Sequence, residues 1–166
     1  MMTDSLLPEV LTALARRVIT ENAAAGRKIA VAESCTGGLV SAALTEIAGS
    51  SDVLDRGFVT YSNEAKQELL GVSPDIIDTF GAVSIACAWA MAHGAVLHSR
   101  ADVAVAVSGI AGPAGGSSDK PVGTVVFARA TRGDEETVAE EKRFEPGTRA
   151  EVRLQAALVA LELLLP

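Results

Sequence analysis

Apolar positions along the chain switch repeatedly between helical spacing and short continuous runs, which is the pattern of an α/β protein. Leucines and a valine recur every three or four positions in residues 5–24 and predict an amphipathic helix. Valine and alanine alternate without a charge after Asp102 in residues 102–108, as in a strand buried on both faces. The same criteria predict strands at 28–33, 54–61, 122–130 and 136–144, and helices at 36–48, 63–71, from Ser73-Pro74, from Ser84 to about His98, and from Thr148 to Leu165.

Polar residues at several predicted helix starts support these assignments. Asn63 is expected to cap the helix over 63–71, and Ser73 precedes a proline at a first helical position. Thr148 and Glu151 have the spacing of a capping box. Strands and helices alternate early and a β-hairpin follows late, so we expect a mixed sheet in a single domain over residues 1–166.

Composition restricts the function classes. The net charge is −7 and no run of Lys or Arg offsets it, which argues against a nucleic-acid partner. The two cysteines, Cys35 and Cys87, have neither metal-type spacing nor the density of a disulfide framework, so we expect no metal, no cofactor and reduced thiols. The absence of a basic leader and of a long apolar stretch predicts a cytoplasmic protein without a membrane segment.

Three polar, glycine-containing segments each follow a predicted strand. They are residues 32–38, 61–66 and 108–116. Ligands of open α/β sheets bind outside the carboxyl ends of the strands. The sequence therefore predicts a cleft that combines a hydroxyl nucleophile, a lysine and glycine-rich backbone.

Ser34 is the candidate nucleophile, because it lies where the first strand gives way to a glycine-containing turn. The backbone N–H groups of Thr36, Gly37 and Gly38, together with the dipole of the following helix, could hold a phosphate or an oxyanion. A simple capping role for Ser34 or Thr36 fits the same pattern. Cys35 is adjacent, but no histidine partner is evident and a buried, inert thiol is the expected state.

Lys66 and Tyr61 are the candidate proton-transfer residues. A lysine screened from water loses basicity and can act as a general base toward a serine. Taken alone, Lys66 also fits a solvated helix residue, and Tyr61 fits a packing residue of a strand. The loop over 109–123 lacks both the phosphate-binding pattern of nucleoside triphosphatases and the dinucleotide-binding fingerprint, which leaves binding of a small anion.

The segments taken together resemble the C-terminal domain of the competence/damage-inducible protein CinA, whose free-standing members are nicotinamide-nucleotide amidohydrolases. The resemblance runs from about residue 5 to the end of the chain. It rests on Ala32–Gly38, Ile47–Ser51, Gly57–Lys66, Gly81–Ser84, Ser108–Pro113 with Gly115-Gly116, and Lys120–Val125.

This resemblance implies a three-layer α/β/α sandwich with a mixed, mostly parallel five-stranded sheet. It also implies hydrolysis of the carboxamide of nicotinamide mononucleotide (NMN) to nicotinic acid mononucleotide and ammonia, in pyridine nucleotide recycling. On this hypothesis Ser34 attacks the carboxamide carbon, Lys66 acts as base and Tyr61 assists proton transfer. Substrate-binding roles are expected for Thr36, Gly37, Gly38, Ser108, Gly109, Ile110, Gly112 and, toward the phosphate, Arg149.

Two other functions stay open from the sequence. The same mechanism could act on another small amide, and a non-catalytic nucleotide-binding domain could share the family's motifs. The joint presence of Ser34, Lys66 and Tyr61 favours an enzyme, because a binding module does not need that set. Small-residue helices and apolar termini lead us to expect a homodimer.

Overall fold

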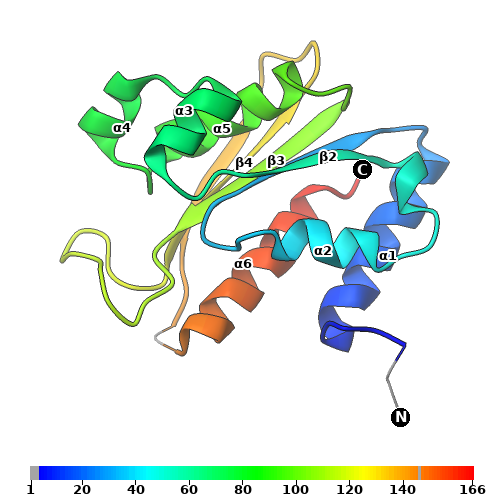
Figure 1. The fold of residues 1–166 in the computed structure, drawn as a ribbon, viewed down its shortest axis with the longest axis horizontal. Helices are drawn as coiled ribbons and strands as arrows, with labels where there is room; N and C mark the ends of the chain where they lie inside the picture. The colour runs from blue at the N-terminus through cyan, green and yellow to red at the C-terminus, as the bar shows by residue number, and fades with distance from the viewer. Residues whose placement is uncertain (1–3, 146) are drawn as a thin grey trace.

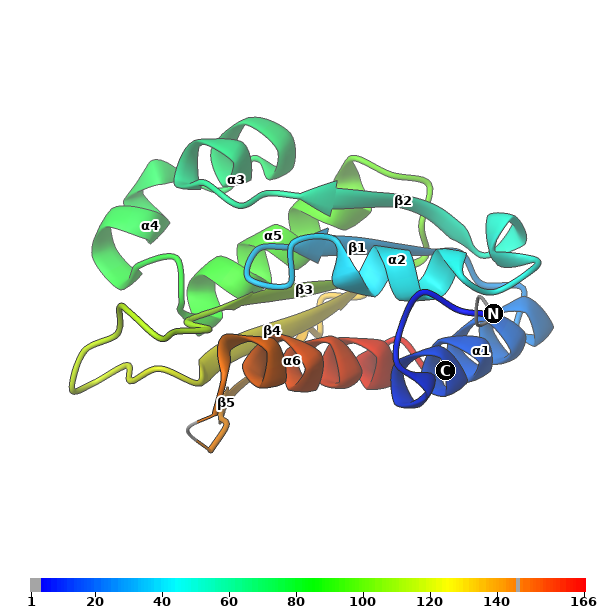
Figure 2. The same ribbon diagram turned by 60° about the horizontal axis from the view of Figure 1, so that its bottom comes forward.

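The computed structural model describes residues 4–145 and 147–166 and forms three layers (Figures 1 and 2). Helices α1, α2 and α6 cover one face of a central sheet, and α3, α4 and α5 cover the other. The helices are α1 (Glu9–Ala24), α2 (Leu39–Thr45), α3 (Asn63–Leu70), α4 (Pro74–Phe80), α5 (Ile85–Leu97) and α6 (Arg149–Leu163), with a short 3₁₀ turn at Ser50–Asp52. The strands are β1 (Ile29–Glu33), β2 (Leu54–Val59), β3 (Val103–Gly109), β4 (Thr124–Thr131) and β5 (Val138–Arg143).

Within the described residues the sheet has five strands in the order β2-β1-β3-β4-β5. β1 pairs in parallel with β2 and β3, whereas β4 is antiparallel to both of its neighbours. β4 therefore opposes the direction of the other four strands, and β4 and β5 form the late hairpin. The prediction of a mixed, mostly parallel sheet in a three-layer α/β/α domain is confirmed.

Alternation along the central strands divides the core by side-chain size. Valines of β3 at positions 103, 105 and 107 pack toward α1, α2 and α6, while Ala104 and Ala106 face α5. The alanines let α5 approach the sheet closely. Gly94 of α5 lies so near the backbone of Leu70 that the two helices touch there without an intervening side chain. This contact fixes the position of α3, which carries Lys66.

Several element boundaries differ from the predictions. The helix predicted over 36–48 is shortened to Leu39–Thr45, because Gly37 and Gly38 have φ values of 59° and 97° and cannot continue a right-handed helix. The cap of α3 is Ser62 rather than Asn63, since its hydroxyl accepts a hydrogen bond from the Ala65 N–H at 3.0 Å. The other predicted caps are confirmed, including the capping box of Thr148 and Glu151.

Candidate active site

Ser34 and Lys66 meet at the carboxyl end of β1. Ser34 is tied to the neighbouring strand by its N–H, which donates to Val107 O at 2.9 Å. Lys66 reaches over from α3, and its Nζ lies 2.9 Å from Ser34 Oγ. Both side chains are removed from water, with exposed fractions of 7% for Ser34 and 1% for Lys66. The two residues are 32 positions apart in sequence, and the fold places them in hydrogen-bond contact.

The surroundings of Lys66 orient its amine toward the serine. Nζ also donates to Thr60 O at 2.9 Å and Tyr61 O at 3.1 Å. Carbonyl oxygens accept only, so these two contacts occupy two N–H bonds whatever the protonation state. The third position on Nζ faces Ser34 Oγ. In neutral Lys66 this position holds the nitrogen lone pair.

Burial lowers the pKa of Lys66 from its ordinary value of 10.5, because the charged ammonium is desolvated. Weaker interactions with the thiols of Cys87 and Cys35 oppose this effect. The consequence is a larger neutral fraction near neutral pH than a solvated lysine has. The arrangement matches that of a serine activated by a lysine base.

A cleft of about 190 Å³ opens in front of the pair. Tyr61 and Arg149 stand at it together: the guanidinium of Arg149 donates to the Tyr61 hydroxyl at 3.1 Å and to Gly112 O at 2.8 Å. Tyr61 is 62% exposed, so its ring is a boundary of the cleft rather than core packing. The lining residues are Ser34, Cys35, Tyr61, Asn63, Lys66, Ala82, Val83, Ser108, Gly109, Ala111 and Arg149.

Six of the eleven predicted site residues thus come together in one cleft: Ser34, Lys66, Tyr61, Ser108, Gly109 and Arg149. Ser108 is nearly fully buried on β3, and its hydroxyl donates to Ala82 O at 2.9 Å. This bond ties β3 to the segment before α5 and leaves the hydroxyl oxygen as an acceptor beside the cleft.

The other five predicted residues do not line the cleft. Thr36 is buried with its hydroxyl on Glu33, and the Gly37 N–H donates to Ser34 O at 3.0 Å. The Ile110 N–H is likewise used, by Thr124 O at 2.9 Å, and Gly112 contributes only the carbonyl that Arg149 holds. Gly38 serves as the residue before α2. The amides of Gly37 and Ile110 are already paired within the protein, so their predicted role in holding an anion stays a prediction without support from this geometry.

The N-terminus of α2 is also occupied from within. The carboxylate of Glu33 accepts hydrogen bonds from the N–H groups of Val40 at 2.9 Å and Ser41 at 3.0 Å. An anion already inside the protein therefore neutralises the positive end of this helix. Our expectation that the helix dipole would hold a phosphate or an oxyanion does not apply to these first-turn amides.

Sequence reasoning gave no site role to Glu33, Arg153 or Asn63. Arg153 of α6 donates to the carbonyls of Cys35 and Thr36, both at 3.1 Å. Glu33 and Asn63 both lie within segments that carried the family resemblance, which was the available signal. Arg153 is more than a hundred positions from the turn it supports, and no local pattern indicates such a contact.

Cys35 also lines the cleft, so its thiol is the other candidate nucleophile there. Burial raises the pKa of its thiol to about 11, an effect that a backbone hydrogen bond and the charges of Arg153 and Lys66 only partly offset. The thiolate, which is the reactive form, is therefore scarce near pH 7. The pKa of Cys87 is raised by burial as well.

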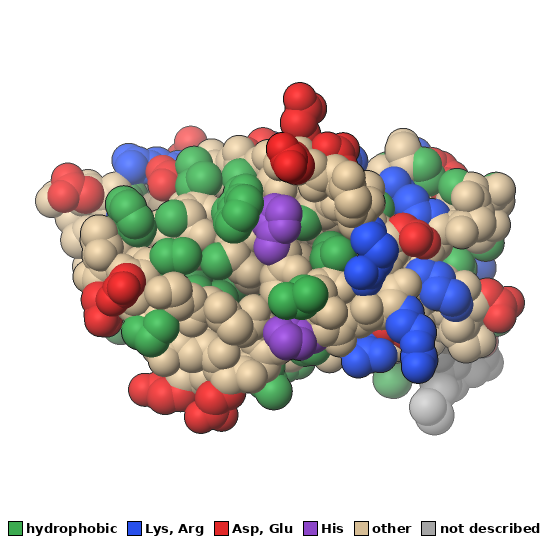
Figure 3. Space-filling model, turned by 90° about the horizontal axis from the view of Figure 1, so that it is seen from above, with side chains coloured by type: hydrophobic (Ala, Val, Ile, Leu, Met, Phe, Trp, Pro, Cys, Tyr) green, Lys and Arg blue, Asp and Glu red, His purple; other side chains and the backbone are tan. Residues whose placement is uncertain are grey.

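A larger cleft of about 540 Å³ lies elsewhere and shares no lining residue with the first. Its walls include Trp89 and His93, whose rings stack with centroids 4.0 Å apart, and His98. Figure 3 shows the two histidines among apolar side chains on the face that carries α3, α4 and α5. Both histidines line this second cleft and not the one at Ser34, whereas Lys66 is in hydrogen-bond contact with Ser34 Oγ.

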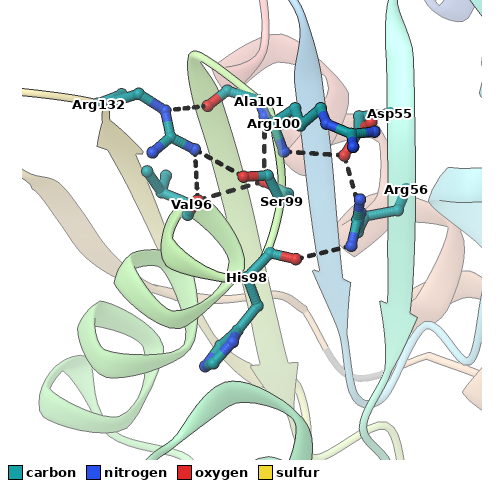
Figure 4. Close-up of polar contacts among 8 residues, drawn as sticks. All are labelled: Asp55, Arg56, Val96, His98, Ser99, Arg100, Ala101 and Arg132. Atoms are coloured by element: carbon teal, nitrogen blue, oxygen red, sulfur yellow. Dashed lines mark hydrogen bonds and ion pairs between the residues drawn. The ribbon is translucent and has the colours of Figure 1, made fainter.

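Beside this second cleft, polar side chains form hydrogen bonds with backbone groups at the end of α5 and in the segment that follows it (Figure 4). Arg132 donates to the carbonyl oxygens of Val96, Ser99 and Ala101 at 2.6 to 2.9 Å. Asp55 accepts from the Arg100 N–H, and its carboxylate pairs with Arg56. These groups satisfy helix-terminal carbonyls and a loop amide, so they are structural. Among the described residues no cluster of His, Cys, Asp or Glu is placed to hold a metal ion, and no helix is long and apolar enough to cross a bilayer.

Comparison with known proteins gives concordant matches. The chain is 55% identical over 139 residues to "Nicotinamide-nucleotide amidohydrolase PncC" of Enterobacter agglomerans, covering 84% of each chain. It is 49% identical over 164 residues to the protein of that name in Escherichia coli K12, covering 98% of this chain and 95% of the relative. A "CinA-like protein" of Syntrophobacter fumaroxidans is 55% identical over 139 residues, and there the match spans 32% of the longer relative.

The fold has a close counterpart among solved structures. The crystal structure of a competence/damage inducible protein from Agrobacterium tumefaciens superimposes with a TM-score of 0.93, at 53% identity and 96% coverage of both chains. The family model of the CinA C-terminal domain matches residues 11–166. On sequence and fold alike, this chain belongs to the CinA C-terminal domain family.

Proposed function

We propose that the protein hydrolyses the carboxamide of NMN to nicotinic acid mononucleotide and ammonia, in pyridine nucleotide recycling. The observation that carries the proposal is the buried contact of 2.9 Å between Lys66 Nζ and Ser34 Oγ at the base of a cleft. The relatives named as nicotinamide-nucleotide amidohydrolases, which match over most of their length, support the choice of substrate.

The proposed chemistry begins with neutral Lys66. Ser34 Oγ attacks the carboxamide carbon while its proton passes to Lys66 Nζ, which the carbonyls of Thr60 and Tyr61 hold in line. The tetrahedral intermediate collapses as Lys66 returns the proton to the leaving nitrogen, releasing ammonia and leaving an ester on Ser34. A water molecule then attacks this ester and gives its proton to Lys66, and the collapse releases the carboxylate and restores Ser34.

Tyr61 and Arg149 are assigned to substrate orientation at the mouth of the cleft. In the described part of the chain no carboxylate lies within ion-pair distance of Arg149, whose recorded hydrogen bonds go to a neutral carbonyl and a phenol. Its positive charge is therefore available to a phosphate. We assign the Tyr61 hydroxyl, held by Arg149, to assisting proton transfer to the leaving group.

The oxyanion requires hydrogen-bond donors that are not already used. Since Gly37 and Ile110 donate within the protein, we assign this role to the amide of Gly109, because Gly109 lines the cleft together with Ser34. Ser108 is assigned to a polar contact with the substrate, because its hydroxyl lies beside the cleft on the strand next to β1.

The first test is ammonia release from purified protein given NMN, nicotinamide riboside or nicotinamide. Release from NMN that is lost in Ser34→Ala and Lys66→Ala supports the proposal. Arg149→Ala should raise KM for NMN and lose the preference for NMN over the riboside, because the riboside lacks the phosphate. Activity on other small amides but not on NMN would overturn the substrate assignment, and folded protein without amidase activity would indicate a binding role.

Cytoplasmic location, a homodimer and the absence of a nucleic-acid partner stay predictions from the sequence. Light scattering of the purified protein measures the oligomeric state directly. A monomer at micromolar concentration would contradict the homodimer.

A further inference from the structure

Glu33 is a buried carboxylate that the proposed chemistry does not use, although it directly precedes the nucleophile. It is the last residue of β1, and its side chain is fully shielded from water. Ile29 and Val31 of the same strand pack toward α1, α2 and α6, and the two-residue period places Glu33 on that face as well. Ser34 instead reaches Lys66 of α3, on the opposite face of the sheet.

The carboxylate of Glu33 accepts four hydrogen bonds from the segment that follows Ser34. Oε1 accepts from the Thr36 hydroxyl at 2.7 Å and the Val40 N–H at 2.9 Å. Oε2 accepts from the Ser41 N–H at 3.0 Å and the Ser41 hydroxyl at 2.8 Å. All four donors are neutral, so the negative charge is held by hydrogen bonds and the helix dipole rather than by a cation.

These bonds replace the capping side chain that α2 lacks. The residue before the helix is Gly38, which has no side chain to accept from the first-turn amides. Glu33 supplies that acceptor from the other end of the turn. Residues 34–38 therefore form a short loop that Glu33 holds at both ends. The peptide bond joins Glu33 to Ser34, and its carboxylate accepts hydrogen bonds from the first turn of α2, which follows the loop.

The hydrogen bonds that hold this turn determine where Ser34 lies. The turn is held on its carbonyl side by Arg153 and on its amide side by the bond from Ser34 N–H to Val107 O. Thr36, two residues beyond Ser34, is tied to Glu33 through its hydroxyl. A shift of α2 relative to β1 would therefore be transmitted through this turn to Ser34 Oγ and would change its distance to Lys66.

We propose that Glu33 is a positioning residue for the nucleophile: it locks α2 and the turn 34–38 to β1, so that Ser34 Oγ stays within reach of Lys66 Nζ. This proposal deepens the proposed amidase function and rests on it for its kinetic consequence. Glu33 touches neither substrate nor cleft, so its loss should affect the chemical step rather than substrate binding.

The test compares Glu33→Gln with the wild type by kinetics and by crystal structure. Glutamine keeps the size, but its amide nitrogen cannot accept from the Ser41 N–H, and the negative charge is gone. We expect kcat for NMN to fall by about 100-fold with KM changed less than about threefold, as for a nucleophile displaced by roughly 1 Å. In the crystal structure the distance from Ser34 Oγ to Lys66 Nζ should exceed the 2.9 Å of the wild type.

Ser41→Ala is the milder companion variant, because it removes one hydrogen bond from Oε2 and leaves the charge and both amide bonds. It should fold even if Glu33→Gln does not, and its kcat should fall by a few-fold with KM unchanged. Ser73→Ala is the matched control: it removes the capping hydroxyl of α4, far from the turn, and should lower Tm without changing kcat.

Wild-type kcat in folded Glu33→Gln, or in Ser41→Ala if Glu33→Gln does not fold, would overturn the positioning role. So would a rise in KM with kcat unchanged. If the wild type released no ammonia from NMN, the proposed function would fail, yet the crystallographic distance in the variants would still decide the role of Glu33.

Discussion

Gly94→Ala tests whether the close contact of α5 with α3 sets the geometry of the candidate catalytic pair, Ser34 and Lys66. A Cβ at Gly94 would lie 2.8 Å from the carbonyl carbon of Leu70 and closer still to its oxygen, whereas ordinary contact begins at 3.4 Å. Both groups belong to backbone of packed helices, so no side-chain rotation relieves the contact. The helices must separate by more than 0.6 Å, the difference between these two distances, because the oxygen contact is tighter still.

The displacement acts directly on Lys66, which lies one helical turn before Leu70 on α3. A shift of that size away from Ser34 would lengthen the distance between Lys66 Nζ and Ser34 Oγ from 2.9 Å to about 3.5 Å, the limit of a hydrogen bond. We expect kcat to fall by roughly 10- to 100-fold. Overpacking costs about 1–3 kcal/mol, and the better helix propensity of alanine offsets about 1 kcal/mol of this, so the net loss of stability is up to about 2 kcal/mol.

Ammonia release and thermal unfolding measure the two effects, with Leu97→Ala as control. Leu97 lies on the same helix with its side chain 74% exposed, so its truncation should leave kcat unchanged and stability within about 0.5 kcal/mol. Wild-type kcat in Gly94→Ala would refute the argument, since it would mean that α3 can move without disturbing Lys66.

Four further outcomes follow from the structure. Because Lys66 must be neutral to act as base and burial lowers its pKa below 10.5, kcat/KM should rise with pH along an acid limb whose midpoint lies below 10.5; a midpoint at 10.5 would contradict this. Between that lowered pKa and 10.5 the unfolded chain binds more protons than the folded one, so the free energy of unfolding should rise with pH, and urea titrations of Lys66→Met should lack this contribution. Arg153→Ala should lower kcat by about tenfold with KM nearly unchanged, since it frees the carbonyls of Cys35 and Thr36; a change confined to KM would argue for substrate contact instead. Cys35→Ala should retain kcat, and wild-type Cys35 should react slowly with iodoacetamide at pH 7.5 because its thiol has a pKa of about 11; loss of activity would reopen the choice of nucleophile.

Local patterns in the sequence were sufficient to predict the helices and strands and their order along the chain. The alternation of valine and alanine before Ser108 predicted a central strand, and β3 is buried along nearly its whole length. Capping residues located the starts of α4, α5 and α6 because such bonds join residues only two or three positions apart. The error at Asn63 was a matter of one residue, since two adjacent side chains could serve equally well as caps.

The turn after β1 shows the limit of that approach. Ser34 with the glycines that follow it indicated an anion site at a helix N-terminus, and the sequence pattern alone supported that interpretation. The structure instead places Glu33 on the first-turn amides of α2. Whether a helix terminus is free depends on which way a neighbouring side chain turns, and this is decided by the faces of the sheet and not by sequence spacing.

By itself the sequence determined the fold class, the family resemblance and the residue types available for chemistry, because these follow from periodicity, turn residues and short motifs. Only the tertiary structure decided that Lys66 is buried against Ser34, that Arg149 holds Tyr61 at the cleft, and that Arg153 supports the turn after Ser34. Each of these contacts joins distant segments of the chain, at separations of 32 to 118 positions. Such contacts exist only once the helices have packed on the sheet, and burial then changes the pKa of Lys66 and turns an ordinary helix lysine into a candidate base.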